Sequence, residues 1–352
     1  MPIRRLSAPV TALYAELLDL LLIRETQRSI AHLRGGFTSK ILNDRRYWYF
    51  QYRDIRKGVR QIYIGPDNDA ARHLIRQFEE GRHTIKADEQ HINELAAMLR
   101  RGEMHTVDSV VFKVLQALSD SGLFKRGAVL VGTHAFVALG NLLGVKWVSP
   151  ASQTQDIDLA QDSTVGLALP EASESVDLPA VLDNLQMGFL PVPPLNPKDP
   201  STSFKIRGRS LRLDLLTPAT GRRTKPVPLT SLKAAAQPVR FLDYLLELPE
   251  RAALLGRSAI LVNVPDPARF AIHKLIVSQH RIAAFHTKAA KDRAQAAQLL
   301  EVLAEERPSE LKAAWKTACK RGARWSQAAL AALTQIEKLS LGDISKAREI
   351  LR

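Results

Sequence analysis

Two carboxylates alternate with apolar residues in the segment 156–159, whose sequence is D-I-D-L. Residues two apart on a strand point the same way, so Asp156 and Asp158 project from one face while the apolar residues face a core. Shortly before, the segment 129–135 (V-L-V-G-T-H-A) predicts a strand, a Gly132-Thr133 turn and a helix. A helix start offers backbone N–H groups to phosphates, and a phosphate-handling Mg²⁺ binds a few clustered carboxylates. The pattern therefore predicts a site for a metal ion and a phosphorylated ligand.

A third carboxylate, Asp214, lies in a later strand-like segment, 211–216, with the sequence L-R-L-D-L-L. It shares a face with Arg212, and an aspartate among leucines is costly to bury unless it is paired or binds a ligand. If this strand pairs with the strand of Asp156 and Asp158, three carboxylates converge at one point. Two Mg²⁺ (or Mn²⁺) ions about 3.5–4 Å apart then bind there, one activating an attacking hydroxyl and one holding a triphosphate.

The chain is strongly basic, with a formal net charge of +14 and a pI near 10.0. A positive surface attracts polyanions, so an anionic partner or substrate is expected; the alternative is a basic surface that is only solvated. Cys319 is the single cysteine, which excludes a disulfide framework and a cysteine-rich zinc site and favours a cytoplasmic location. No run of about 18 apolar residues occurs, so no membrane span is expected, and the first apolar segment lacks a cleavage signal for export.

The fold class expected from these patterns is α+β, with a mixed sheet flanked by helices. Three parts are expected: an N-terminal helix–β-hairpin module (1–104), a core (105–235) and a mostly helical C-terminal domain (236–352). The first part is predicted to contain a helix over 11–33, strands over 47–52 and 61–65, and helices over 66–81 and 85–101. The core adds a helix capped at 106–108, a helix over 178–186, and a hairpin of 203–206 with 210–217. The last part begins with strands over 241–248 and 258–264, and a helix with Lys274 follows.

The ordered set of Gly132-Thr133, Asp156-Ile157-Asp158 and Asp214 resembles the polymerase-beta-type nucleotidyltransferase superfamily over roughly residues 105–220. That superfamily has a Gly-Ser-like turn, an Asp-x-Asp pair and a third Asp on a later strand; here Thr133 replaces the usual Ser and keeps the hydroxyl. The resemblance implies a nucleotidyltransferase core over 105–235, in which Asp156 and Asp158 bind both metals and Asp214 completes the nucleophile-side site. It also implies that Gly132 and Thr133 hold the β- and γ-phosphates of an NTP, whose nucleoside monophosphate passes to a hydroxyl.

A second resemblance covers 264–275 (V-P-D-P-A-R-F-A-I-H-K-L) and 291–296 (K-D-R-A-Q-A). These segments are similar to the helical half of AbiEii-type toxin nucleotidyltransferases. The similarity implies that Lys274 touches the nucleotide phosphates and that Asp292, with Lys291 beside it, completes the pocket. It further implies a toxin or phage-defence role, with RNA (tRNA) or a protein side chain as acceptor and with a partner protein. The N-terminal hundred residues match nothing in that pattern, so the choice of substrate or partner is assigned to them.

Two basic groups are candidates for nucleic-acid contact. One flanks the proposed metal site and contains Lys205, Arg207, Arg209, Arg212, Arg222, Arg223 and Lys225. The other interleaves basic and aromatic residues: Arg45, Arg46, Tyr47, Trp48, Tyr49, Tyr52, Arg53, Arg56, Lys57 and Arg60. The alternative for the second group is that its aromatic residues form the core of a small domain and its arginines form the solvated face.

Ordinary structural roles remain open for several site candidates. Thr133 is equally suited to capping a helix, Lys274 to a solvated helix face, and Asp292 to pairing with Lys288 or Arg293. The alternative function is a catalytically inactive nucleotidyltransferase-fold protein that binds nucleic acid or acts in a toxin–antitoxin interaction. The three intact carboxylates count against that alternative.

Overall fold

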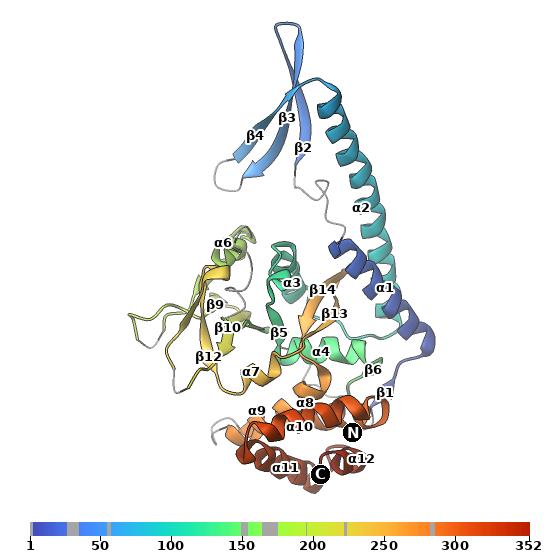
Figure 1. Cartoon of the computed structure of the whole chain (residues 1–352), viewed down its shortest axis with the longest axis vertical. Coiled ribbons are helices and arrows are strands. Elements are labelled where there is room, and N and C mark those ends of the chain that lie inside the picture. The colour runs from blue at the N-terminus through green and yellow to red at the C-terminus, as the bar shows by residue number, and fades with distance from the viewer. Residues whose placement is uncertain are drawn as a thin grey trace.

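The computed structural model describes residues 3–26, 35–54, 58–148, 154–163, 175–194, 196–221, 224–281 and 286–352. The molecule is elongated, because a small sheet lies at one end of the long helix α2 (Asp69–Arg101) and the rest of the chain packs around the other end (Figure 1). A mixed sheet flanked by helices and a helical C-terminal region confirm the expected fold class.

The central sheet has the strand order β11-β12-β10-β7-β5, with β9 paired to β10 and β8 paired to β9. Its strands are β5 (Val129–Val131), β7 (Asp156–Ala160), β8 (Phe189–Pro191), β9 (Ser203–Ile206), β10 (Arg212–Pro218), β11 (Val227–Leu229) and β12 (Ala234–Val239). β10 runs parallel to β7 and β12, whereas β5, β8, β9 and β11 pair antiparallel with their neighbours. A mixed sheet of this kind needs apolar cover, which α3 (Ser109–Asp120), α4 (Gly132–Leu142) and α6 (Leu178–Asn184) provide.

A hairpin and a set of helices complete the main body. The hairpin is β13 (Glu250–Leu255) with β14 (Ala259–Val264), and the short helix α7 (Leu242–Leu245) precedes it. The helices are α8 (Pro267–His280), α9 (His286–Glu306), α10 (Pro308–Lys320), α11 (Ala323–Lys338) and α12 (Ser345–Ile350). Asp266 begins α8 because its side chain accepts a hydrogen bond from the backbone N–H of Arg269, satisfying a donor that the helix itself cannot pair. Short pieces β1 (Arg4–Arg5) and β6 (Val145–Lys146) pair beside this body.

The N-terminal residues form α1 (Ala8–Thr26), then a three-stranded antiparallel sheet, then α2. The strands are β2 (Gly36–Leu42), β3 (Arg45–Asp54) and β4 (Gly58–Pro66), in the order β2-β3-β4. The C-terminal half of α2 buries Leu95 and Leu99 against α1 and the β13–β14 hairpin, in a core separate from that of the central sheet. The small sheet packs instead on the N-terminal half of α2, through Phe78.

Three sequence predictions were wrong in this region and beyond it. The expected hairpin over 47–65 is a three-stranded sheet, because 36–42 pairs with β3 despite its weak alternation of apolar and polar residues. The two expected helices over 66–101 are one continuous helix, since Phe78 and Ile85 on either side of Gly81 pack on the same sheet and outweigh its poor helix propensity of about 1 kcal/mol. The expected strand over 241–248 is the helix α7, whose buried Leu242 and Leu245 are one helical turn apart.

Some predictions lie outside the described residues. The predicted end of the first helix falls in 27–34, and Arg56, Lys57, Arg222 and Arg223 from the basic groups also lie in segments that are not described. In the ranges that are described, no helix is both long and apolar enough to span a bilayer.

Leu99→Ala tests how α2 is fixed to the main body. Leu99 is fully buried, so truncating it removes packing and leaves a cavity, and we expect the free energy of unfolding to fall by about 2–5 kcal/mol. Met98→Ala is the matched control, because the neighbouring side chain is 53% exposed and should change stability by less than about 0.5 kcal/mol. Urea unfolding measures both, and equal effects would show that α2 is not anchored through this face.

Candidate functional site

Asp158 and Asp214 lie side by side on neighbouring parallel strands. The register of β7 and β10 pairs Asp158 with Asp214 and Asp156 with Arg212. Ile157 and the other alternate residues of β7 are buried behind the strand, so the acidic side chains share the opposite face. Burial and the neighbouring negative charges of Asp214 and Asp156 raise the pKa of Asp158 to about 6. The strand pairing therefore brings together the carboxylates that the sequence placed on separate strands.

Gly132 brings the start of a helix against the same carboxylate. β5 ends at Val131, whose register partner on β7 is Asp158, and α4 begins at the next residue. Gly132 has a φ of 68°, and a Cβ built on it would lie only 2.2 Å from Oδ2 of Asp158. Glycine is thus required here both for its left-handed backbone and for the close approach of the carboxylate.

A lysine that the sequence analysis named only as a neighbour of Asp292 reaches the Gly-Thr turn. Lys291 on α9 donates a hydrogen bond from Nζ to Oγ1 of Thr133 at 3.0 Å. Burial and the positive charge of Lys274 lower the pKa of Lys291, while the carboxylates of Asp292, Asp156 and Asp158 act in the opposite direction. A partly desolvated ammonium group therefore lies at the helix start, close to the acidic residues.

Lys274 and Asp292 contact each other directly. Nζ of Lys274 donates to Oδ1 of Asp292 at 2.7 Å, and Nε of Arg281 donates to Oδ2 at 2.6 Å. Asp292 is buried, which on its own would raise its pKa, but Lys274 and Arg281 together hold the pKa below its usual value. The sequence suggested Lys288 or Arg293 as a partner of Asp292, but these two hydrogen bonds come from Lys274 and Arg281. The buried pair also ties α8 to α9.

Asp214 is held from one side by two polar neighbours. Its Oδ1 accepts hydrogen bonds from Nε of Arg212 at 2.8 Å and from Oγ of Ser203 on β9. Nη2 of Arg212 donates in turn to Oγ of Ser203 at 3.0 Å. The sequence placed Arg212 on the face of Asp214, but the contact with Ser203 was not anticipated, because Ser203 becomes a neighbour of Asp214 only through the antiparallel pairing of β9 with β10.

The donor set of this site fits a divalent cation. Hard carboxylate oxygens from Asp156, Asp158 and Asp214 are the ligand type that Mg²⁺ prefers. The raised pKa of Asp158 reflects its burial first and the repulsion by Asp214 and Asp156 second, and a bound cation would offset both effects. The carboxylate of Asp158 also occupies the space left by the missing side chain of Gly132, next to backbone N–H groups suited to phosphates.

A family model described as "Nucleotidyltransferase" matches residues 109–320, which is more than half of the 352-residue chain. The chain belongs to this nucleotidyltransferase family. The match includes both strands of the acidic pair, the Gly132-Thr133 turn, and the helices of Lys274 and Lys291. Searches of curated proteins and of solved structures gave no match. Membership gives the general activity, nucleotidyl transfer from an NTP, while the similarity to the AbiEii type stays a prediction.

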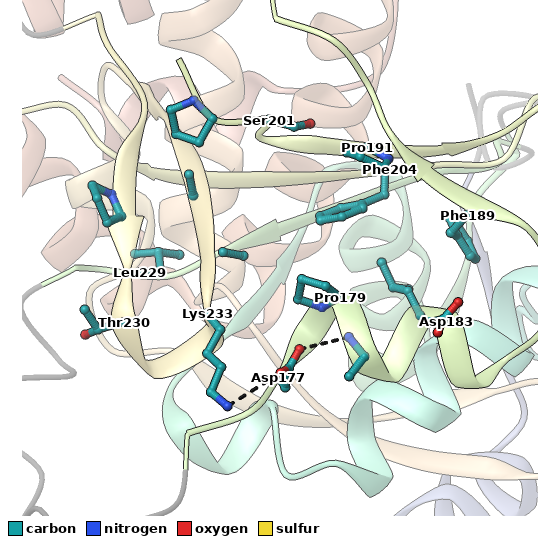
Figure 2. Close-up of a pocket in the computed structure, with 16 residues that line it drawn as sticks. Asp177, Pro179, Asp183, Phe189, Pro191, Ser201, Phe204, Leu229, Thr230 and Lys233 are labelled. Carbon is teal, nitrogen blue, oxygen red and sulfur yellow. Dashed lines mark hydrogen bonds and ion pairs between the residues drawn. The ribbon is translucent and has the colours of Figure 1, made fainter. Parts of the chain in front are cut away.

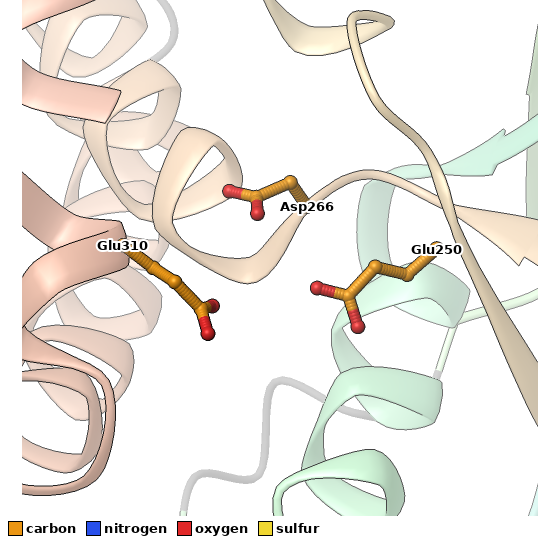
Figure 3. A group of neighbouring side chains, drawn as sticks. All are labelled: Glu250, Asp266 and Glu310. Atoms are coloured by element: carbon orange, nitrogen blue, oxygen red, sulfur yellow. The ribbon is translucent and has the colours of Figure 1, made fainter. Parts of the chain in front are cut away.

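A second carboxylate group of this nucleotidyltransferase lies elsewhere and has its own explanation. Carboxylate oxygens of Glu250, Asp266 and Glu310 lie within 4.8 Å of one another (Figure 3). Among the described residues, Asp156, Asp158 and Asp214 do not form a group this tight. Nη1 of Arg307 lies 3.3 Å from Glu250 and 3.4 Å from Glu310. Asp266 caps α8. The group is therefore accounted for by an ion-pair network and a helix cap.

None of Asp156, Asp158 and Asp214 lines the apolar pocket in Figure 2. It has a volume of about 860 Å³ and is lined by residues of α6, β8, β9 and β11–β12, including Phe204, Leu229 and Lys233. Phe204 alternates with Ser203, whose side chain reaches Asp214, so the pocket is on the opposite face of the sheet. An ion pair of 3.5 Å between Asp177 and Lys233 crosses part of the pocket.

The nucleic-acid candidates fall into two separate places. Arg207 and Arg209 are exposed in the turn between β9 and β10, on the strands that carry Ser203 and Asp214. Arg45, Arg46 and Trp48 belong to the small sheet at the N-terminal end of α2 (Figure 1).

Two histidines near the site are buried and uncharged. His134 and His273 have ring nitrogens with no hydrogen-bond partner in the part of the chain that the structure describes. Burial and nearby lysines, Lys291 for His134 and Lys274 for His273, lower their pKa values to about 4 and about 3.

Asp158→Asn tests the cost of ionising Asp158, which burial and the neighbouring carboxylates both raise. Because the folded state raises the pKa of Asp158, it binds this proton more tightly than the unfolded chain does, so ionisation costs stability as the pH rises from about 4 through 6. Removing the charge should raise the free energy of unfolding at pH 8 by about 1–3 kcal/mol, with little change below pH 4. Urea unfolding in EDTA at pH 4 and pH 8 measures it, with the exposed Asp19→Asn as control. Parallel pH dependences of Asp158→Asn and the wild type would contradict the assignment.

Proposed function

We propose that this nucleotidyltransferase moves a nucleoside monophosphate from an NTP to a hydroxyl of RNA (tRNA among them) or of a protein, with a divalent metal. The observation that carries the proposal is the pairing of Asp158 with Asp214 beside the glycine-led start of α4. Carboxylates at a phosphate-binding helix start are the minimum that metal-dependent phosphoryl chemistry requires.

In this proposal Asp156, Asp158 and Asp214 hold Mg²⁺ or Mn²⁺. The metal, when bound, supplies charge neutralisation at the phosphates and a lowered pKa for a bound hydroxyl. Arg212 and Ser203 keep the carboxylate of Asp214 in one orientation, which leaves its second oxygen directed to other ligands. Asp214 also accepts the proton of the attacking hydroxyl. The hydroxyl oxygen then bonds to the α-phosphorus as the bond from that phosphorus to pyrophosphate breaks.

The triphosphate is assigned to the start of α4. Backbone N–H groups of Gly132 and Thr133 receive its β- and γ-phosphates, and Lys291, which bonds Thr133, adds a positive charge there. Lys274, proposed from the family resemblance as a phosphate contact, acts mainly by holding Asp292. Its ammonium also lies close enough to lower the pKa of Asp158 against the effect of burial, so it contributes to the field in which the phosphates bind.

The acceptor is proposed from the charge of the chain, and the biological role from the family resemblance. The basic charge of the chain, +14, favours a polyanionic acceptor. A toxin or phage-defence role, with a regulating partner protein, is proposed from the AbiEii resemblance alone.

Labelling with each α-³²P NTP in turn tests the proposed reaction. Wild-type protein is incubated with Mg²⁺ or Mn²⁺, total RNA and a protein lysate, and transfer of label to RNA or protein is measured. An Asp156→Ala/Asp158→Ala variant should lose at least about 100-fold in rate. Mutating residues that only hydrogen-bond to metal ligands already lowers activity or metal affinity by about 10–100-fold, and these two aspartates are proposed as ligands themselves. Asp19→Asn is the matched control and should label normally. Equal labelling by the double variant and the wild type would remove the site, and absence of metal-dependent NTP binding would favour the inactive binding protein.

Lys291→Ala and Lys274→Ala should have different consequences. Removing Lys291 deletes a charged contact to phosphate worth about 1.5–3 kcal/mol, so KM for the NTP should rise tenfold or more with little change in stability. Removing Lys274 leaves buried Asp292 with Arg281 alone, so the free energy of unfolding should fall by about 1–3 kcal/mol. Steady-state kinetics and urea unfolding distinguish the two, with exposed Lys338→Ala as control. A normal KM for Lys291→Ala would exclude Lys291 from the phosphate site.

A further inference from the structure

The small N-terminal sheet has one covered face and one open face. Phe50 of β3, with Phe37 and Ile64 on the neighbouring strands, packs against Phe78 of α2. Side chains alternate along each strand, so the residues between these positions lie on the other face. The view of the whole chain shows α2 on one side of this sheet and the main body at the far end of the helix (Figure 1). The other face is called the open face below.

Three tyrosines gather on the open face. Strand register places Tyr49 opposite Tyr63, and Tyr47 lies two residues before Tyr49. The ring centroids of Tyr49 and Tyr63 are 5.5 Å apart, and those of Tyr47 and Tyr63 are 6.3 Å apart. Tyr63 is 55% exposed although it is aromatic. Tyr47 and Tyr49 are half-buried, so the three rings form one aromatic surface that is most open to solvent at Tyr63.

The charge of the open face is positive. Nζ of Lys40 lies 4.9 Å from the centre of the Tyr49 ring, and Arg45 follows the same alternation as Tyr47 and Tyr49. No acidic residue of the described strands alternates onto this face; Asp44 is in the turn between β2 and β3. A surface of tyrosine rings with adjacent cations complements a ligand that has flat rings and negative charge.

Arg46 and Trp48, which the sequence analysis grouped with Arg45, lie on the covered side. Nε1 of Trp48 donates to Oδ1 of Asp67 at 3.0 Å, and Arg72 forms an ion pair with the same carboxylate. Arg46 lowers the pKa of Asp67, which places its charge near that carboxylate as well. These two residues therefore belong to the attachment between sheet and helix, and they are left out of the open face.

We propose that the open face binds single-stranded RNA by stacking unpaired bases on Tyr47, Tyr49 and Tyr63. Bases in a duplex are already stacked on each other, whereas unpaired bases are free to stack on aromatic side chains while cations contact the phosphates. Gln51 and Gln61, whose side chains bond each other on this face, offer amide groups to base edges and 2′-hydroxyls. The choice of RNA over DNA rests on the proposed transfer to an RNA hydroxyl; the binding itself does not.

The position of the open face makes it a holding site rather than part of the chemistry. Phe78 contacts the sheet and Leu99 contacts the main body, and a helix rises about 1.5 Å per residue, so the two contacts are about 30 Å apart along α2. An acceptor bound at the open face would extend from there to the aspartates. The sheet then determines which acceptor is retained, and the aspartates carry out the transfer.

Fluorescence anisotropy with a labelled, unpaired RNA of about 12 nucleotides, containing only A and C, tests the proposal without metal or nucleotide. Tyr49→Ala/Tyr63→Ala should weaken binding by about tenfold or more, because each lost base–ring stack contributes about that factor or a larger one. Tyr49→Phe/Tyr63→Phe keeps both rings and should bind within about twofold of the wild type. Ile62→Ala is the matched control, since this 52%-exposed neighbour of Tyr63 is on the other face. The Tm of each variant verifies folding.

The comparison ligands are the same sequence as duplex RNA and as single-stranded DNA, both of which should bind more weakly. Wild-type affinity of the Tyr49→Ala/Tyr63→Ala variant, or stronger binding of the duplex, would overturn base stacking on this face. Equal affinity for the DNA strand would overturn the assignment to RNA. Because no NTP is present, failure here leaves the proposed transfer untouched, and failure of NTP labelling leaves RNA binding by this face untouched.

Discussion

The parallel pairing of β7 with β10 is the constraint on which the site depends. It sets Asp158 next to Asp214 on one half-buried face, and burial together with the charge of Asp214 raises the pKa of Asp158 to about 6. Nothing in apolar packing calls for such a pair, because alternate residues on the same strands already fill the core. The arrangement is accounted for if a cation and a phosphorylated ligand bind there, as membership in a nucleotidyltransferase family implies.

A buried ion pair connects this acidic face to the helical part of the chain. Asp292 on α9 binds Lys274 on α8 and Arg281 just after it, so the two helices are fixed relative to each other. The preceding residue on α9, Lys291, then reaches Thr133 at the start of α4. The resemblance to toxin nucleotidyltransferases directs attention to Lys274, whereas the lysine that contacts Thr133, in the turn proposed to bind phosphate, is Lys291. The buried ion pairs of Asp292 therefore help to position Lys291 beside Thr133.

Local patterns in the sequence predicted much of the site's framework. Alternation placed Asp156 and Asp158 on one face, and Gly-Thr marked the start of α4. What could not be predicted depended on partners distant in the chain. The helix α2 continues through Gly81 because a sheet packs on both sides of that glycine, and Ser203 reaches Asp214 only after β9 and β10 pair. The open face could not be predicted either, because the packing of Phe78 from α2 decides which aromatic residues of the small sheet are covered.

A Mn²⁺ soak with anomalous diffraction at the manganese edge tests the central claim most directly. Two groups of three carboxylates compete for the ion: Asp156, Asp158 and Asp214 at the sheet, and Glu250, Asp266 and Glu310 beside Arg307. With an NTP analogue present, the anomalous peak is expected between Asp158 and Asp214, with the triphosphate at Gly132 and Thr133. A peak at the glutamate group, with none at the aspartates, would contradict the account.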